Sequence, residues 1–583
     1  MRSDAPQRAL PFAYGIAVAV VAIVYLNALQ TPFVYDDHRT VVENFSIRDF
    51  RDWRAVLLYQ PLRPVLNISY AIDSAIWGEN PFGFHLTNVL LHILNVLLLF
   101  RIGVAFESDR ERRQPGGMGQ VRPEIVGFTA ALIFAAHPMM TSAVTYVTGR
   151  SEVLCTTFFL AALLCARRCL LDKGRRWWLL TVGLWILPLA TKEVAAMFPL
   201  VLMAYERFVL RLTPERRRRA IQILIGPMLS VAALVAVGRL VAFSFVEHTG
   251  DVSLDGQLVF AEVNVIVGYL KLMLMPEGQT IFHAVPLAGL LDVRTLMSFA
   301  VVVALVLIGW RARARAGLVT FGLAWFFLLL VPSTLLVLLG RAEPMAEHRV
   351  YLASCGLILV AGTAVEWSLR RSTLKTRRAR LALQALMVVA LLSLGGRAML
   401  RNAVWADPIG LWRESVAQAP QHWLPRLLLG EALHAAGRQQ EAIAEYRRGI
   451  NLRPDQELAY QKLARAWLET GNLGQAWATF YELRGRYPQS VVAANGLGAL
   501  ALLTGDREGA RTHFLRALEF DAGDVTARQS LALIAETEPI DAREALRLCE
   551  EIRQLAPRTP GNEDCIKRNR ERLANGSASA VKP

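Results

Sequence analysis

The chain has 583 residues, of which 54% are apolar, and its mean hydropathy of +0.33 is far above that of an ordinary soluble protein. A formal net charge of +15 raises the question of nucleic-acid binding. Most basic residues, however, stand in clusters beside apolar blocks, as the positive-inside rule describes for membrane proteins, so no nucleic-acid partner is expected.

Apolar blocks recur along the first 400 residues, and a membrane-spanning helix needs roughly 20 such residues. The first block follows Arg2 and Arg8 and lacks a small-residue cleavage site, which indicates a retained signal anchor. We predict about eleven spans, near residues 11–29, 86–104, 124–137, 152–170, 177–191, 193–210, 220–241, 293–310, 317–338, 350–368 and 380–400.

Segment 258–275 is also partly apolar but carries Glu262 and Lys271. A span here would move the arginines of 311–315 to the outside, so we expect an interfacial or re-entrant segment. Eleven spans with a cytoplasmic N-terminus then gather the polar loops on the outer face. These loops are residues 30–85, 138–151, around 192, 242–292 and 339–349.

The large outer loop 30–85 opens with Tyr35-Asp36-Asp37-His38. Two adjacent carboxylates at the mouth of a membrane helix are costly unless they have a function. A general base and a metal ligand both use this chemistry. The alternative is a solvated loop end without a chemical role.

Several arginines are also predicted on the outer face, against the usual charge bias. Each either pairs with a nearby acid or binds an anionic ligand such as a phosphate, for which a guanidinium fork is well suited. They are Arg63, Arg150, Arg341 and Arg349. On the second span, His85, Asn88 and His92 share one helical face, which suits either helix packing or substrate contact.

The sequence beyond residue 401 repeats with a period of 34 residues. This period is typical of tetratricopeptide helix pairs and predicts an α-solenoid over residues 402–574, followed by a disordered tail at 575–583. The repeating positions are Gly437, Gly471 and Gly505; Ala442, Ala476 and Ala510; Tyr446, Phe480 and Phe514; and Pro420, Pro454 and Pro488. Cys549 and Cys565 are free to pair if this domain lies in an oxidising compartment.

A set of short motifs occurs in a characteristic order and spacing. These are Tyr35-Asp36-Asp37-His38, Arg63-Pro64, the run from Asn80 to His92, His137-Pro138, Gly149-Arg150-Ser151-Glu152, Lys192-Glu193 and Arg349-Val350-Tyr351-Leu352. Together with the repeats, they resemble the transmembrane and tetratricopeptide-repeat O-mannosyltransferases, which have the GT-C fold. One departure is Pro138-Met139-Met140-Thr141-Ser142, which lacks an acid that the family often has there.

The resemblance implies an all-α protein, with a polytopic GT-C helical bundle over residues 1–401. It also implies transfer of mannose or another hexose from a polyprenyl phosphate to a protein Ser or Thr hydroxyl, with the repeats presenting the acceptor. Asp36 would be the catalytic base and Asp37 its companion. Arg349, Arg150 and Arg63 would bind the donor phosphate. The further substrate-site candidates are His38, His85, His137, Glu152, Lys192, Glu193 and His348.

Other functions remain open at this stage. One alternative is an enzyme of the same fold that acts on a lipid or glycan acceptor, and another is a non-catalytic membrane scaffold that recruits partners through its repeats. Two adjacent acids do not define a coordination shell, so the sequence leaves a divalent metal open. The excess of arginine over lysine and the lack of targeting additions favour a bacterial inner membrane, with the site and the repeats in the periplasm.

Overall fold

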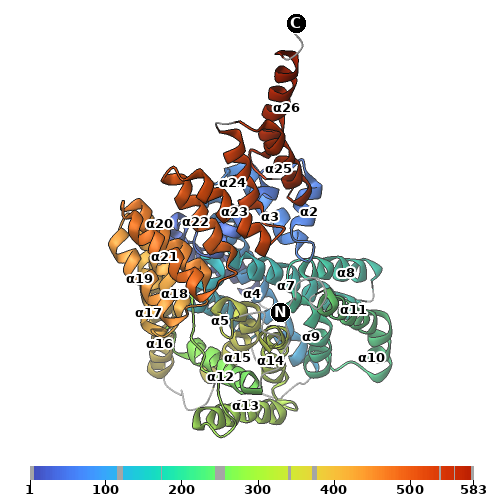
Figure 1. The fold of residues 1–583 in the computed structure, drawn as a ribbon. Coiled ribbons are helices and arrows are strands. Elements are labelled where there is room, and N and C mark those ends of the chain that lie inside the picture. The colour runs from blue at the N-terminus through green and yellow to red at the C-terminus, as the bar shows by residue number, and fades with distance from the viewer. Residues whose placement is uncertain are drawn as a thin grey trace. The chain divides into compact units, whose positions relative to one another are not determined.

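The computed structural model describes residues 5–113, 122–172, 174–242, 256–338, 343–370, 377–537, 540–556 and 559–579. These residues form helices and loops without any strand (Figure 1), so the all-α prediction is confirmed. The chain divides into two compact units, Met1–Gln418 and Ala419–Pro583. The division falls 17 residues beyond the predicted boundary at 401, because helix α17 (Pro408–Gln418) is part of the first unit.

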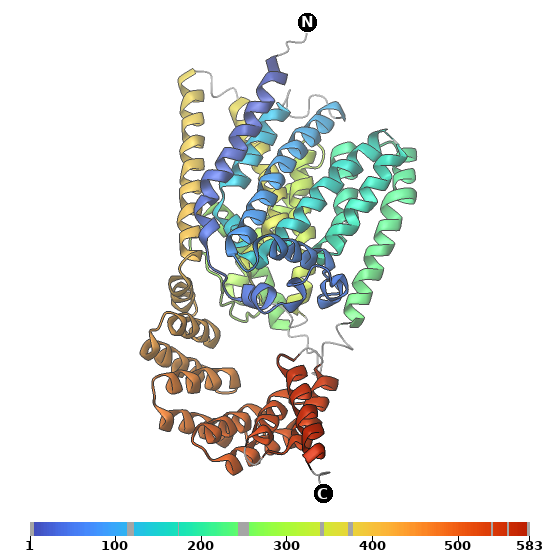
Figure 2. The same cartoon turned by 90° about the horizontal axis from the view of Figure 1, so that it is seen from above.

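The first unit is a bundle of apolar helices (Figure 2). Among the described residues, nine helices are long and apolar enough to cross a membrane, or ten if one bent pair, Pro123–Ala136 with Pro138–Val144, is a single span. The protein is therefore a multi-pass membrane protein. The bundle helices are α1 (Ala5–Tyr25), α4 (Pro81–Arg113), α5 (Pro123–Ala136), α7 (Arg150–Asp172), α8 (Arg175–Leu189), α9 (Phe198–Tyr205), α11 (Gly226–Ala242), α12 (Gly256–Leu274), α13 (Val293–Ala312), α14 (Gly317–Leu338), α15 (Tyr351–Arg370) and α16 (Arg377–Trp405).

The predicted count of about eleven spans differs from the nine or ten apolar helices of the described structure at three segments. Segment 177–191 forms the short helix α8, which has only 15 residues. Segment 193–210 is divided among a 3-10 helix, α9 and a π-helix, so no single long helix forms there. Helix α12, by contrast, was not counted as a span but is long and apolar enough to cross a membrane.

Contacts of α12 nevertheless favour the predicted interfacial position. The Tyr269 hydroxyl donates to the Ala346 carbonyl oxygen at 3.0 Å, and the Met273 carbonyl oxygen lies 3.0 Å from His137 Nε2. Glu262, eleven residues before Met273, shares a small pocket with Arg349. Both halves of α12 therefore contact the end of the bundle that holds residues 345–349.

Helices α1 and α16 run in the same direction. The Asn402 side chain donates to the Val24 carbonyl oxygen, and the Asn27 side chain donates to the Met399 carbonyl oxygen, both at 2.9 Å. The carboxyl ends of these two helices thus meet at one end of the bundle. Parallel first and last helices require an odd number of crossings between the two ends, a condition that nine and eleven both meet.

Small residues let other helices pack closely. A Cβ on Gly322 of α14 would overlap the Gly356 carbonyl oxygen of α15, so only glycine permits this approach. The loop between α1 and α4 is itself ordered around a small apolar core. It contains α2 (Trp53–Tyr59), capped by the Asp52 carboxylate, and α3 (Pro64–Trp77), which begins with proline.

The second unit is a stack of antiparallel helices. They are α18 (Trp423–Ala435), α19 (Gln439–Leu452), α20 (Glu457–Glu469), α21 (Leu473–Arg486), α22 (Val491–Leu503), α23 (Arg507–Phe520), α24 (Val525–Glu536), α25 (Ala542–Leu555) and α26 (Asn562–Ser579). Gly437, Gly471 and Gly505 have φ angles of 75°, 75° and 84°, so each ends the first helix of its pair in a conformation that favours glycine. This is the physical origin of the 34-residue glycine spacing.

Two details concern the end of the array. Cys549 of α25 and Cys565 of α26 form a disulfide, which was left open by the sequence. The predicted disordered tail is wrong for residues 575–579, because α26 continues to Ser579. Residues 580–583 lie outside the described part of the chain.

Candidate active site

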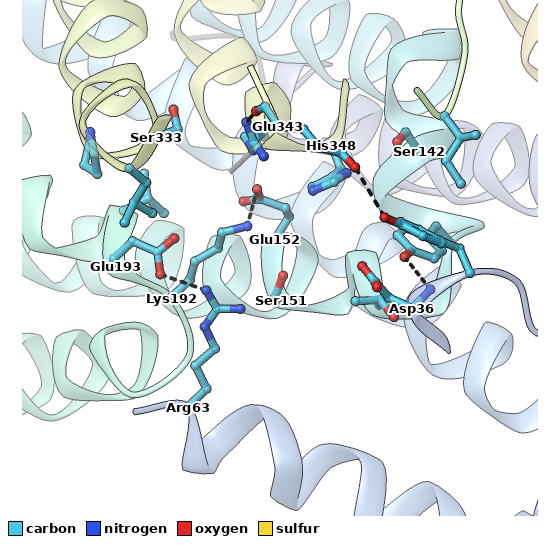
Figure 3. Close-up of a pocket in the computed structure, with 18 of the residues that line it drawn as sticks. Asp36, Arg63, Ser142, Ser151, Glu152, Lys192, Glu193, Ser333, Glu343 and His348 are labelled. Atoms are coloured by element: carbon cyan, nitrogen blue, oxygen red, sulfur yellow. Dashed lines mark hydrogen bonds and ion pairs between the residues drawn. The ribbon is translucent and has the colours of Figure 1, made fainter. Parts of the chain in front are cut away.

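A polar cavity of about 360 Å³ opens in the first unit, at the bundle end where α1 and α16 finish. It brings together residues from the loop between α1 and α4, the start of α7, the segment after α8, the loop before α15 and the end of α16 (Figure 3). Its polar and aromatic lining residues are Tyr35, Asp36, Arg63, Ser142, Tyr146, Thr148, Ser151, Glu152, Lys192, Glu193, Ser333, Glu343, His348, Arg349 and Trp405.

Asp37 does not line this cavity. Its carboxylate is fully buried and accepts hydrogen bonds from the Val34 N–H at 3.1 Å, the Thr148 N–H at 2.8 Å and the Thr148 hydroxyl at 2.7 Å. Burial raises the pKa of Asp37 to about 7, against the lowering effect of these hydrogen bonds. Asp37 therefore fastens the turn at residues 34–37 to the loop that precedes α7.

Asp36 has a different environment. Its side chain is exposed to the cavity, while its N–H donates to the Tyr146 hydroxyl at 3.2 Å. The surrounding protein still removes water, which raises the pKa of Asp36; the Tyr146 hydroxyl and Arg39 act in the opposite direction. The preceding residue, Tyr35, has a φ of 52°, which is unusual for a residue other than glycine and turns the two acids in different directions.

Glu343 is another acid on the cavity wall, and the sequence had not singled it out. Its Oε1 accepts a hydrogen bond from the Tyr35 hydroxyl at 3.3 Å. Burial and the nearby Asp36 raise the pKa of Glu343, while Arg349 lowers it. The one signal in the sequence that could have identified Glu343 is its position in the predicted outer loop 339–349. Arg341, named in the same loop, lies outside the described residues.

Three cations line the cavity. Arg63 pairs with Glu193 at 3.1 Å, and Lys192 pairs with Glu152 at 2.6 Å. Arg349 donates to the Glu343 carbonyl oxygen and has no ion pair with any acid in the described ranges. Of the three, Arg349 therefore has the most capacity to bind an added anion.

Arg150 lies inside the bundle and not on the cavity wall. It is fully buried, pairs with Asp73 at 2.5 Å, and donates to the Asn88 side chain at 2.8 Å and the Phe84 carbonyl oxygen at 2.7 Å. Its guanidinium carbon also lies 4.8 Å from the centre of the Tyr70 ring. The sequence left open whether Arg150 pairs with an acid or binds an anionic ligand. In the structure it pairs with the buried Asp73.

Three of the candidate histidines lie away from the cavity wall. His85 and His137 are buried and contact backbone carbonyls of Thr31 at 2.8 Å and Met273 at 3.0 Å. His38 is exposed and does not line the cavity. His348 is the remaining candidate histidine and does line it.

One wall of the cavity comes from α14. Leu329, Pro332, Ser333 and Leu336 follow the i, i+3, i+4, i+7 pattern of one helical face. Beside this face, Val331 and Leu335 are 50% and 54% exposed, as expected for residues that contact lipid. The cavity therefore joins a charged region to a lipid-facing helix.

Helices α16 and α17 pack against the acidic turn. The Trp405 ring stacks on Tyr146 with ring centres 5.4 Å apart, and Trp412 meets the Tyr35 ring edge-on at 5.5 Å. The Tyr146 hydroxyl accepts a hydrogen bond from the Asp36 N–H, and the Tyr35 hydroxyl donates one to Glu343. No pattern in the sequence predicts these two tryptophan contacts.

No group of three or more His, Cys, Asp or Glu side chains suited to a metal ion occurs within the part of the chain that the structure describes. Two of the four cavity acids, Asp36 and Glu343, are hydrogen-bonded to tyrosine hydroxyls, and the other two, Glu152 and Glu193, are paired with Lys192 and Arg63. A divalent metal stays an open prediction.

Comparison with known proteins agrees with the resemblance. The TPR repeat family model matches residues 430–471. The Drosophila melanogaster protein O-mannosyl-transferase Tmtc3 is 24% identical over 564 residues, which cover 84% of this chain and 60% of that protein. The mouse protein O-mannosyl-transferase TMTC2 is 31% identical over 186 residues, 29% of this chain and 21% of that protein. The predicted similarity to this family is confirmed, although the chain spans about 60% or less of these relatives.

Solved structures give only weak likenesses. Yeast Tom70 is 12% identical, with 82% of this chain and 88% of that chain covered, at a TM-score of 0.28. MamA is 18% identical, with 25% and 85% covered, at a TM-score of 0.22. Such scores carry no argument about this site.

Proposed function

We propose that the protein is a membrane glycosyltransferase that moves a sugar, mannose or another hexose, from a polyprenyl phosphate to a Ser or Thr hydroxyl of a protein. The observation that carries the proposal is that one cavity contains both an accessible carboxylate, Asp36, and an arginine, Arg349, that forms no ion pair with an acid of the described residues. The names of the relatives as protein O-mannosyl-transferases support the same reaction.

The chemistry follows from these two residues of the cavity wall. The acceptor oxygen attacks the anomeric carbon and forms the new glycosidic bond, while Asp36 takes the hydroxyl proton. The bond from the anomeric carbon to the phosphate oxygen breaks, and the lipid phosphate leaves with the electron pair. Arg349 stabilises its negative charge. The α14 wall at Leu329 and Leu336 provides an apolar path for the lipid chain.

The location is proposed on similar grounds. We place the site and the array on the extracytoplasmic face of a bacterial inner membrane. The disulfide between Cys549 and Cys565 supports an oxidising compartment for the second unit. A reporter enzyme fused after the last residue, active only outside the cytoplasm, tests this; activity in the cytoplasm would reverse the orientation.

Asp36→Asn tests the reaction directly. The full chain in lipid nanodiscs is given polyprenyl-phosphate mannose and a Ser/Thr-rich peptide, and mannosyl peptide is measured by mass spectrometry. Loss of a general base should slow transfer by roughly 10²–10⁴-fold. Asp49→Asn, an exposed acid of the same loop, is the control and should keep full activity. Full activity in the Asp36→Asn protein would refute the assignment.

A second arm separates the alternatives. A lipid or glycan acceptor is offered in place of the peptide. Sugar transfer to that acceptor instead of the peptide identifies an enzyme of the same fold with another acceptor. A wild-type protein that transfers sugar to none of these acceptors supports the non-catalytic scaffold.

A further inference from the structure

A second cavity lies at the opposite end of the bundle from Asp36. Helix α7 begins beside the first cavity at Ser151 and Glu152, and reaches the second cavity at Cys169. Seventeen residues of helix from Glu152 to Cys169 span about 26 Å. Helix α8 makes the return path, from Arg175 at the second cavity to the segment with Lys192 at the first.

The second cavity has about the same volume, 360 Å³, but a different lining. It is formed by the end of α7, the start of α8, the short helix α10 (Pro214–Ala220) and the π-helix that follows it (Ile221–Ile225); Figure 1 shows α8, α10 and α11 along one edge of the bundle. Its apolar residues are Cys169, Leu170, Trp178, Leu212, Ala220, Ile223 and Leu224. Trp178 is held by a hydrogen bond from its indole N–H to the Ile223 carbonyl oxygen at 3.2 Å.

Three arginines line the same cavity: Arg175, Arg216 and Arg219. All three are exposed, and none forms an ion pair with an acid in the described ranges. Their neighbour Arg217 differs, because it is paired with Glu206 at 2.9 Å. Arg216 and Arg219 are three residues apart on α10 and so share one helical face. The cavity therefore combines an uncompensated positive rim with an apolar wall.

Setting the orientation of the membrane spans does not by itself explain why three arginines surround a cavity. The positive-inside rule needs basic residues near the ends of spans, and it is indifferent to whether they surround a cavity. Arg218 of the same helix meets the rule equally well, yet it does not line the cavity. Concavity, a fixed tryptophan and three guanidinium groups are instead the features of a site for a phosphate that carries acyl chains.

We propose that this cavity binds the headgroup of an anionic phospholipid from the leaflet at this end of the bundle. The phosphate would contact Arg216, Arg219 and Arg175, and an acyl chain would lie along Trp178 and Leu224. Planar guanidinium groups hold phosphate oxygens well, and tryptophan favours the membrane interface. The apolar wall selects a lipid over free phosphate. This site is independent of the reaction proposed at Asp36.

The test uses the full-length protein in detergent, with phosphatidylglycerol or phosphatidylcholine added, and native mass spectrometry to count retained lipids. Wild-type protein should retain phosphatidylglycerol in preference to phosphatidylcholine. Arg216→Gln with Arg219→Gln should weaken phosphatidylglycerol retention by about tenfold, since each cation contributes to attraction of an anionic headgroup. Arg218→Gln, on the same helix but off the cavity, is the matched control and should retain it fully.

Three results would overturn the proposal. One is equal retention of phosphatidylglycerol by wild type and the double variant. Another is an equal loss in the Arg218→Gln control, which would show a general charge effect. The third is displacement of the lipid by millimolar inorganic phosphate as readily as by glycerophosphoglycerol, which would identify a free-phosphate site. Because the three arginines are exposed, the variants should fold; an unchanged apparent Tm checks this, and Arg175→Gln provides an independent variant.

Discussion

Asp37→Asn should change how the stability of the bundle depends on pH. Burial raises the pKa of Asp37 from its ordinary value of 3.8 to about 7. An acid with a higher pKa in the folded protein binds its proton more tightly there. Its stabilising contribution is therefore complete below the unfolded pKa near 4, and is lost as the pH rises through 7.

The two pKa values set the size of the effect. Between pH 5 and pH 8, proton linkage removes roughly 2–3 kcal/mol from the free energy of unfolding of the wild-type protein. Asparagine has no proton to lose. Its amide oxygen can still accept the two hydrogen bonds from Thr148 that Asp37 Oδ1 accepts. The variant loses the bond that Asp37 Oδ2 accepts from the Val34 N–H, so it should be somewhat less stable than wild type at pH 5, and the difference should shift in its favour by pH 8.

Thermal unfolding in detergent at pH 5, 6, 7 and 8 measures this difference as a shift in apparent Tm. Asp49→Asn, an exposed acid of the same loop, is the control and should leave the pH dependence unchanged. A constant difference between wild type and Asp37→Asn from pH 5 to pH 8 would refute the reasoning, as would a difference that grows in favour of wild type.

Two further predictions concern buried pairs. Arg150→Met leaves Asp73 as an uncompensated buried charge and should destabilise the bundle by about 3–5 kcal/mol; a raised KM for the lipid donor with an unchanged apparent Tm would instead support phosphate binding. Replacing both Cys549 and Cys565 with serine opens a link between positions 16 residues apart and should cost the second unit about 3 kcal/mol. Circular dichroism with and without reductant measures this, and the double variant should be insensitive to reductant.

The array and most of the bundle were predictable because they depend on periodicity. A left-handed glycine ends the first helix of each of three pairs, so Gly437, Gly471 and Gly505 give the 34-residue repeat directly. Apolar blocks likewise identify long helices. The predicted segment 177–191 forms the 15-residue helix α8, whereas segment 193–210 is broken into three shorter helices; composition does not report where a helix breaks.

The residues of the candidate site could be predicted in outline, but the sequence does not show which of them line the cavity and which are buried in the bundle. Asp36 and Asp37 are chemically identical neighbours, and only the positive φ of Tyr35 and the hydrogen bonds from Thr148 assign one to the cavity and the other to the interior. Arg150 and Arg349 were also equivalent as arginines on the outer face. The first meets Asp73 inside the bundle, a contact between segments 77 residues apart that no local pattern encodes.

The same long-range packing connects the acidic turn to the helices that lead into the array. Trp405 of α16 stacks on Tyr146, and Trp412 of α17 meets Tyr35. A third link runs through the Thr280 hydroxyl, which lies 2.9 Å from the Ser415 hydroxyl, while the Thr280 N–H donates to Glu347 at 2.7 Å. Helix α17 therefore contacts the turn that holds Asp36 directly, through Trp412, and the loop that holds Arg349 indirectly, through Thr280 and Glu347.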